Sequence, residues 1–197
     1  MALAQQIIDA TEARINALPL QVRGWSAPNR ENALSRLRDM GLPSRRDEYW
    51  KFTRPDSLND VTSQAAAVFT PDEAPVFASV DRLHLVFVDG VFDEDASDDL
   101  SLEGLTIERL ADVADKDIHW AKDVYGTLEA LGQAPVKRPL AALNTAFATD
   151  GVLIRVTGKV SKPVNITYLH RSETSAAYLH HVIRLEAGSE LTLLENG

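Results

Sequence analysis

The sequence has no cysteine. Without thiols the chain cannot form disulfides, and by itself it cannot hold zinc or an iron–sulfur cluster through thiolate ligands. It also has no P-loop, no serine nucleophile elbow and no dinucleotide-binding glycine fingerprint. These absences favour a binding protein over an enzyme, and any ATP hydrolysis would have to come from a partner.

Long hydrophobic runs and an excess of basic residues are also missing. No apolar run approaches the ~20 residues that a transmembrane helix needs, and the first residues lack the basic start of a signal peptide. The sequence therefore predicts a cytoplasmic protein. The formal net charge of −9 argues against nucleic acids and anionic membranes as partners, because both attract basic surfaces.

The charges that are present are unevenly distributed. Residues 1–54 contain nine Lys/Arg and six Asp/Glu, residues 55–130 contain four and eighteen, and residues 131–197 contain seven and five. The acidic middle predicts a surface that differs from the surfaces of its flanks. Hydrophobic residues make up 45% of the chain, so we expect a packed core and not a disordered chain.

The N-terminal region, residues 1–54, is predicted to be helical. Residues 3–18 repeat apolar side chains at three- and four-residue steps and stop at Pro19. Residues 28–40 begin at Pro28 and end at Gly41, which are ordinary start and stop signals. The stripe of the first helix consists of Ile8, Thr11, Ile15 and Leu18.

The middle of the chain divides into a predicted linker and a mixed segment. Residues 55–79 are rich in proline and small residues and favour a linker. Residues 80–151 begin with a β-forming run at 83–88, followed by the tight-turn pair Asp89-Gly90 and a return strand. Two helices should follow. The stripe of one consists of Ile118, Ala121, Tyr125 and Leu128, and that of the other of Leu140, Leu143 and Phe147.

Residues 152–197 alternate apolar and polar side chains in short runs without intervening helices. This pattern is typical of a sandwich, a barrel or a β-helix, and the pattern alone does not choose among them. The last residues read as a strand without a cap. We therefore expect the chain to be part of a longer protein and its open β-end to self-associate.

The densest local signal runs from Gly41 to Thr53 and combines a helix stop with basic, acidic and aromatic residues. One interpretation is a loop whose aromatics attach the helical part to the rest of the protein, and this interpretation predicts that Trp50 is substantially buried. The other is a surface that binds a partner, because Trp, Tyr and Arg are common anchors of interfaces. The candidate interaction residues are Arg45, Arg46, Glu48, Trp50, Lys51 and Phe52.

Other candidate sites are weaker. The pair His180-His181 with Glu186 faintly resembles a cupin metal motif, but adjacent residues of a strand point to opposite faces and cannot readily share one ion. The acidic cluster at residues 93–99 lacks the pattern of a calcium loop. Glu186, Glu190 and Glu195 single out no catalytic pair. We expect no catalytic residue, cofactor or metal site in this chain alone.

Four segments resemble the SufB/SufD family, and SufD members in particular. The first is Gly41–Thr53, with Gly-Leu-Pro, a basic pair, Glu and Trp-Lys-Phe-Thr. The others are Leu85–Phe92, Leu143–Gly151 and Leu185–Ser189, which are similar to the family's strand–turn–strand, to the element leading into its β-helix, and to a turn within that β-helix. The four segments span most of the chain in the family's order.

The resemblance implies an α+β fold, in which an N-terminal helical region is followed by the beginning of a right-handed parallel β-helix at residues 152–197. It also implies a scaffold subunit of the SufBCD complex in iron–sulfur cluster assembly, with SufB and the ATPase SufC as partners and a cluster bound only by the complex. The family's SufC-binding region and its cluster-associated histidine lie further downstream. The alternative left open by the residues is an enzyme on a β-scaffold, either cupin-like or carbohydrate-active.

Overall fold

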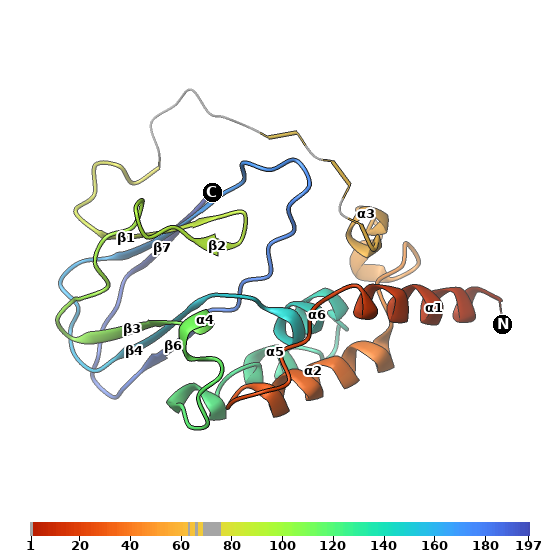
Figure 1. The fold of residues 1–197 in the computed structure, drawn as a ribbon, viewed down its shortest axis with the longest axis horizontal. Helices are drawn as coiled ribbons and strands as arrows, with labels where there is room; N and C mark the ends of the chain where they lie inside the picture. Colours follow the sequence, from red (N-terminus) through yellow and green to blue (C-terminus); the bar gives the residue numbers. More distant parts are fainter. Residues whose placement is uncertain (1, 63, 66, 69–75) are drawn as a thin grey trace. The chain divides into compact units, whose positions relative to one another are not determined.

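The computed structural model describes residues 2–62, 64–65, 67–68 and 76–197. The chain forms two compact units, each built from two stretches of sequence (Figure 1). The first unit comprises Met1–Gln64 and Ala114–Ala148, and the second comprises Ala65–Val113 and Thr149–Gly197. The sequence instead suggested four consecutive segments. The two units interleave because the helices of 114–148 pack on the N-terminal helices, while the strands before and after them pair with one another.

The first unit contains only helices among its described elements. Its first α-helix confirms the predicted helix at 3–18, and its second confirms the one at 28–40. The elements are α1 (Ala2–Asn16), α2 (Ala27–Met40), the 3-10 helix η1 (Glu48–Trp50), α3 (Asp56–Asn59), the 3-10 helix η2 (Trp120–Asp123), α5 (Thr127–Leu131) and α6 (Pro139–Phe147).

The core of the first unit lies where α2 packs along α6. Small and branched side chains at this contact, such as Ala33, Leu37 and Ala146, are completely buried. Trp25, just before α2, is 1% exposed and stacks on His119, with ring centroids 4.9 Å apart. Sequence analysis did not single out Trp25, although it is the largest fully buried side chain in the described residues.

A buried arginine joins the two helices of this core. Arg30 in α2 donates hydrogen bonds from Nη1 to the backbone oxygens of Ala146 (3.2 Å) and Ala148 (2.8 Å) at the C-terminal end of α6. Its Nε donates to Ser26 Oγ at 3.0 Å. The guanidinium therefore caps carbonyl groups that an α-helix leaves unpaired at its end.

One predicted helix is interrupted. The stripe from Ile118 to Leu128 was expected to face the core, but Ile118 is 88% exposed and Leu128 is 82% exposed. The chain instead forms η2, turns at Gly126 with a φ of 71°, and restarts as α5. The left-handed backbone at Gly126 resets the helical phase, so Tyr125 is buried while Leu128 is not.

The second unit contains seven strands in two sheets and one short helix, all in its described residues. One sheet has the order β2-β1-β5-β7, and the other has the order β3-β4-β6. The predicted hairpin is confirmed, because β1 and β2 pair antiparallel around Asp89-Gly90. The elements are β1 (Leu83–Val88), β2 (Val91–Phe92), β3 (Leu105–Arg109), α4 (Leu110–Val113), β4 (Val152–Val156), β5 (Val164–Leu169), β6 (Val182–Leu185) and β7 (Leu193–Asn196).

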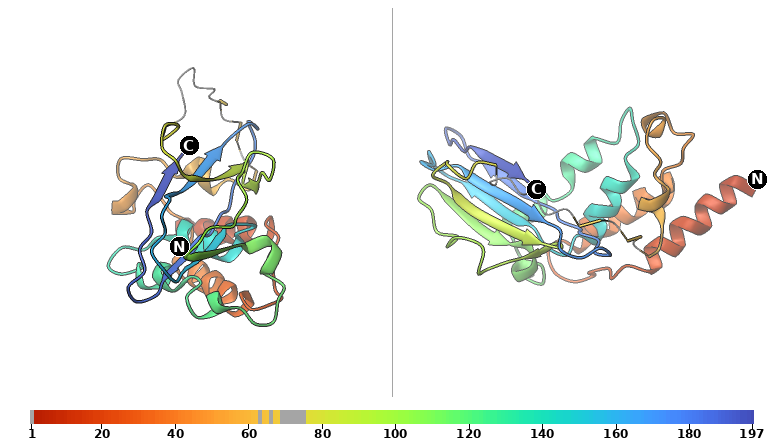
Figure 2. Two further views of the ribbon diagram at one scale, coloured as in Figure 1. Left: turned by 90° about the vertical axis from the view of Figure 1, so that its left-hand side faces the viewer. Right: turned by 90° about the horizontal axis from the view of Figure 1, so that it is seen from above.

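From β4 onward the strands alternate between the two sheets and pair in parallel with the strand one turn earlier. Leu153 pairs with Val182 and Val164 pairs with Leu193, so the partners in both sheets lie 29 positions apart. Figure 2 shows β1, β5 and β7 side by side in one layer. The parallel stacking expected for residues 152–197 is therefore confirmed, whereas the right-handed β-helix stays a prediction.

The space between the two sheets is filled by apolar side chains. Alternate residues of each strand point inward, for example Leu85 and Phe87 from β1, Ile154 from β4 and Ile166 from β5. At the entry to β4, the buried Asp150 accepts hydrogen bonds from Arg109 Nη2 at 3.0 Å and from its own neighbour's backbone. This contact ties the end of β3 to the start of β4.

The predicted linker at 55–79 is only partly covered by the described residues. It contains the short helix α3, and its described residues between α3 and β1 form no helix or strand. Residues 63, 66 and 69–75 lie outside the described part of the chain. None of the helices that the structure describes is both long and apolar enough to cross a membrane.

The order of the elements makes the fold α+β, with helices at the N-terminus and sheets later.

Candidate interaction surface

The motif loop after α2 is anchored at its first residues. The Gly41 N–H donates to Leu37 O at 2.8 Å and ends the helix. The Leu42 N–H donates to Thr11 Oγ1 of α1 at 3.0 Å, and the Leu42 side chain is only 4% exposed. The hydrophobic start of the motif therefore holds the loop against α1, as its Gly-Leu-Pro sequence favours.

Hydrogen bonds within the loop fix its turn. Asp47 accepts the Ser44 N–H at 2.8 Å through Oδ2, and its own N–H donates to Ser44 O at 3.0 Å. Such side-chain-to-backbone bonds are the usual reason for Ser and Asp in turns. The chain then forms η1 and continues into α3, whose Asn59 donates from Nδ2 to Pro43 O at 2.7 Å. The loop is thus held at both ends.

A groove of about 330 Å³ lies between α1, the motif loop and α3. Its apolar lining comes from Ile7 and Ala10 of α1 and from Leu42 and Pro43 of the loop. Arg45 and Arg46 add positive charge to the lining, and Asp56 of α3 adds one carboxylate. The groove can therefore receive an apolar side chain beside a net positive charge.

The basic residues of the motif are available to solvent. Arg45, Arg46, Lys51 and Arg54 are all exposed. Among the described residues, no carboxylate lies within ion-pair distance of any of them. Within the part of the chain that the structure describes, these cations therefore remain without a carboxylate partner.

The aromatic residues of the motif do not act together as a staple. Tyr49 is 65% exposed and Phe52 is 93% exposed, so the prediction that the aromatics attach the loop to the rest is wrong for these two. Trp50 is intermediate between buried and exposed, so its predicted burial is confirmed in part. Its ring meets the edge of Tyr49 in the same segment, with centroids 6.1 Å apart. The Lys51 Nζ lies 5.4 Å from the centre of the Phe52 ring.

The structure brings together only some of the candidate residues. Arg45 and Arg46 share the groove, Lys51 and Phe52 contact each other, and Glu48 is exposed in η1. The contributions of α1 and α3 to the groove were missed. Ile7 lies 35 positions before Leu42, and Asp56 lies just after the motif. No local sequence pattern marks either residue as part of the groove lining.

Residues 1–166 match the family described as the SufBD protein N-terminal region. This chain belongs to the SufB/SufD family. It is similar to the "Iron-sulfur cluster assembly protein SufD" of Escherichia coli (strain K12), with 27% identity over 176 residues. The match covers 86% of this chain and 38% of that relative, so the chain spans well under half of the relative's length. The predicted membership in the SufB/SufD family is confirmed, while the segment Leu185–Ser189 lies outside the residues that the family model matches.

The histidine pair of this SufB/SufD-family chain is not arranged for a metal. His181 accepts the Val152 N–H on Nδ1 at 2.9 Å, and its Nε2 lies 3.1 Å from Tyr168 Oη. The Tyr168 hydroxyl in turn donates to Glu195 Oε1 at 2.7 Å. Burial lowers the pKa of His181 and raises that of Tyr168, because a buried site disfavours the charged form of each group, the imidazolium and the phenolate. Both ring nitrogens of His181 are thus already engaged by the protein.

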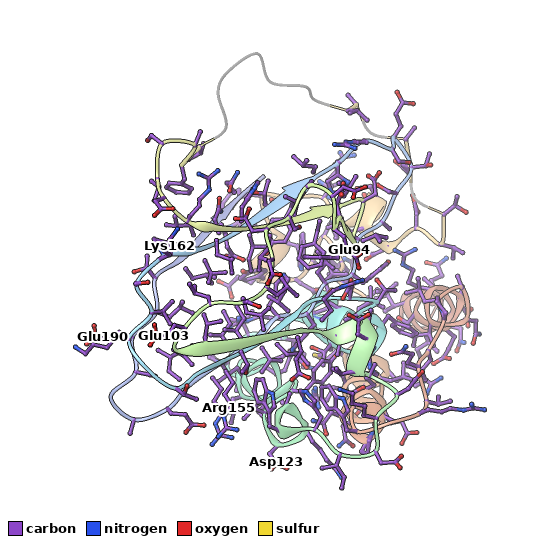
Figure 3. All side chains as sticks on the ribbon, turned by 60° about the vertical axis from the view of Figure 1, so that its left-hand side comes forward. Glu94, Glu103, Asp123, Arg155, Lys162 and Glu190 are labelled. Atoms are coloured by element: carbon purple, nitrogen blue, oxygen red, sulfur yellow. The ribbon has the colours of Figure 1, made fainter. Side chains whose placement is uncertain are left out.

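The glutamates considered for a carbohydrate-active site are also engaged. Glu186 accepts from Arg155 Nε at 2.9 Å, and Glu190 pairs with Lys159 at 2.7 Å. Figure 3 shows that Arg155 points away from the space between the sheets. Within the described ranges there is no cluster of three or more His, Cys, Asp or Glu side chains that could hold a metal ion.

A second depression, of about 410 Å³, lies beside the acidic turn of the second unit. Its lining includes Phe92, Asp93, Glu94 and Asp95, and Figure 3 labels Glu94 there. The Asp93 carboxylate accepts the Ala96 N–H at 3.1 Å and so shapes the turn. Glu94 pairs with Arg109 at 3.4 Å, and the depression is less apolar than the groove beside the motif loop.

Proposed function

We propose that this chain works as a scaffold in iron–sulfur cluster assembly, within a complex of the SufBCD type, and that it is not catalytic by itself. The observation that carries the proposal is the family match over residues 1–166. The similarity to the E. coli iron–sulfur cluster assembly protein SufD supports the same process. In this proposal SufB and SufC are the partners, the cytoplasm is the compartment, and the cluster is bound by the complex and not by this chain.

We also propose that the parallel strands β4 to β7 are the first coils of a right-handed β-helix. The support is the constant offset of 29 positions between paired strands in both sheets. A constant offset is what regular coiling requires, because each turn must add the same length of chain. A β-helix would give the scaffold a rigid shape on which partners can be held.

The function can be tested with a chimera. The N-terminal region of E. coli SufD would be replaced by this chain, and the chimera would be expressed in a strain that lacks SufD. We expect the cluster content of an iron–sulfur reporter enzyme to recover relative to the empty strain. An unrelated α+β domain of similar size serves as the control. A soluble, folded chimera that restores nothing would contradict the proposal.

We further propose that the chain self-associates through its β-edges. β6 and β7 each pair on one side only within the described strands, and Leu185 is 50% exposed. Unpaired strand edges are sites where other chains add. Light scattering should therefore show a species larger than the 21.6 kDa monomer, and a stable monomer would contradict this proposal.

A further inference from the structure

The groove between α1, the motif loop and α3 joins an apolar lining to unpaired guanidinium groups, and two exposed aromatic rings follow within the same segment of the sequence. We propose that it docks an acidic segment of a partner protein that inserts an apolar side chain. The inference rests on the proposed scaffold function and deepens it, because it states the chemistry by which one partner is held.

The apolar lining of the groove defines the first part of the occupant. Ile7, Ala10, Leu42 and Pro43 meet there, and Leu42 is held in place by its bond to Thr11. The volume of about 330 Å³ falls at the lower end of the ~300–1,000 Å³ typical of binding clefts. A side chain that fills this space gains the free energy of removing apolar surface from water.

The charges beside the groove define the second part. Arg45 and Arg46 have no carboxylate partner among the described residues, although Asp and Glu outnumber Lys and Arg by 29 to 20 in the chain. Some other exposed cations are paired, such as Lys159 with Glu190 at 2.7 Å and Lys162 with Asp81 at 2.8 Å, so the chain's surplus of acids does reach part of its surface. Guanidinium groups bind carboxylates with two parallel hydrogen bonds, so an acidic segment satisfies this pair.

Two exposed aromatic rings follow the groove's arginines in the sequence, at Tyr49 and Phe52. Tyr49 and Phe52 are the only exposed aromatic side chains among the described residues. Aromatic residues and arginines are enriched at the centres of protein interfaces, where they gain most from being covered. The Phe52 ring, already in contact with the Lys51 ammonium group, offers a place for the apolar part of a partner chain.

A protein partner fits better than a nucleic acid or a membrane. The whole chain carries a net charge of −9, which repels polyphosphates and anionic lipids at long range. Asp56 in the groove lining and Asp47 in the loop would repel a closely packed row of phosphates. A peptide with spaced carboxylates can meet the arginines and avoid these two acids.

Fluorescence anisotropy with a designed probe tests the inference. The probe is a fluorescein-labelled peptide of about 12 residues with leucines among glutamates, and it is titrated with the purified full chain. We expect saturable binding with a Kd of about 10–100 µM that weakens as salt is raised. A peptide with lysines in place of the glutamates, and one with serines in place of the leucines, should bind at least about tenfold more weakly.

Substitutions in the chain can show where the probe binds. The double variant R45E/R46E should weaken probe binding by about tenfold or more, and Phe52→Ala should weaken it by a smaller factor. The control R23E/K137E makes the same change in net charge at exposed positions of the same unit, and it should bind within about twofold of the parent chain. Circular dichroism should show that all these variants keep their folded spectra.

Several outcomes would overturn the inference. They are the absence of saturable binding, equal loss in the R23E/K137E control, and tighter binding of a single-stranded oligonucleotide or of phosphatidylserine vesicles than of the peptide. Self-association that R45E/R46E abolishes would make a second copy the occupant instead. If the chimera fails to restore cluster assembly while the probe still binds, only the proposed function is contradicted. If the chimera restores cluster assembly but the probe does not bind, only the proposal of a docking groove is contradicted.

Discussion

Replacing Arg30 by methionine should destabilise the first unit by about 2–4 kcal/mol. Arg30 is 1% exposed, and no carboxylate among the described residues is paired with it. Burial lowers its pKa, but guanidinium groups titrate so high that the side chain remains charged at neutral pH. The fold therefore keeps a buried charge whose main partners are the backbone oxygens at the end of α6.

The magnitude follows from what the substitution removes. The backbone oxygens of Ala146 and Ala148 would each lose a donor in a buried place, and an unsatisfied buried acceptor costs about 1–3 kcal/mol. The guanidinium also lies 5.4 Å from the centre of the Tyr125 ring, a contact that contributes about 0.5–2 kcal/mol. Methionine recovers part of this loss, because the desolvation of the charge is no longer needed.

The assay can report on the first unit alone. All three tryptophans of the chain, Trp25, Trp50 and Trp120, lie in that unit. Urea unfolding followed by tryptophan fluorescence should therefore show a lower midpoint for Arg30→Met. The matched control is Arg38→Met on the same helix. Its side chain is 47% exposed and paired with Glu12, so its loss should be within about 1 kcal/mol.

The reasoning would be refuted if Arg30→Met were as stable as the parent chain while Arg38→Met behaved as expected. That result would mean that the desolvation penalty of the buried guanidinium cancels its hydrogen bonds, as happens for some buried ion pairs. The variant Arg30→Lys separates the contribution of the positive charge from that of the guanidinium geometry. Lysine keeps the charge near the helix end but cannot present the planar fork, so it should recover only part of the loss.

Three further predictions address other parts of the chain. His181 has a lowered folded-state pKa, so the stability it contributes is complete above about pH 6.5 and declines as pH falls, because the unfolded chain takes up the proton first. Circular dichroism of urea unfolding should show this decline, and His181→Gln should reduce it, while His84, whose pKa burial also lowers, contributes in the same direction. Gly24→Ala should lower the free energy of unfolding by more than about 2 kcal/mol, because the new Cβ would lie 1.9 Å from a backbone oxygen. The control Gly188→Ala has a similar positive φ but open space around it, so it should lower that free energy by only about 1–2 kcal/mol. Equal losses would show that backbone strain, and not the close contact, decides the effect. Trp50→Ala should lose about 1–2 kcal/mol and not the ~3–5 kcal/mol of a fully buried tryptophan, and a thermal scan by circular dichroism distinguishes the two.

The elements that the sequence predicts well are those with a local cause. The turn at Asp89-Gly90 and the run at 83–88 specify a hairpin by themselves, and that hairpin is present. Both long N-terminal helices also follow from their stop signals and stripes. In contrast, β3 was missed, because residues 105–109 are short and half polar and become a strand by pairing with β4. Their partner lies about 45 positions away, where no local pattern can reveal it.

The candidate site was predicted by its composition but not by its geometry. The motif loop was recognised as a place where charged and aromatic residues gather, yet its groove depends on α1 and α3. The broken helix at Gly126 shows the same limit. A stripe of apolar residues was read as one helix, although a glycine in the left-handed region could shift its phase.

Two tryptophans show what decides burial in this chain. Trp25 is flanked by Gly24, Ser26 and Ala27, and the nearby Arg23 stays exposed, so the ring enters the core and is 1% exposed. Trp50 stands between Glu48 and Lys51, and burying its surroundings would remove several charges from water at a large cost. A segment with aromatic rings among unpaired charges cannot cover itself. Its surface becomes dry only when another molecule brings the opposite charges, which is the property that a docking surface of a scaffold requires.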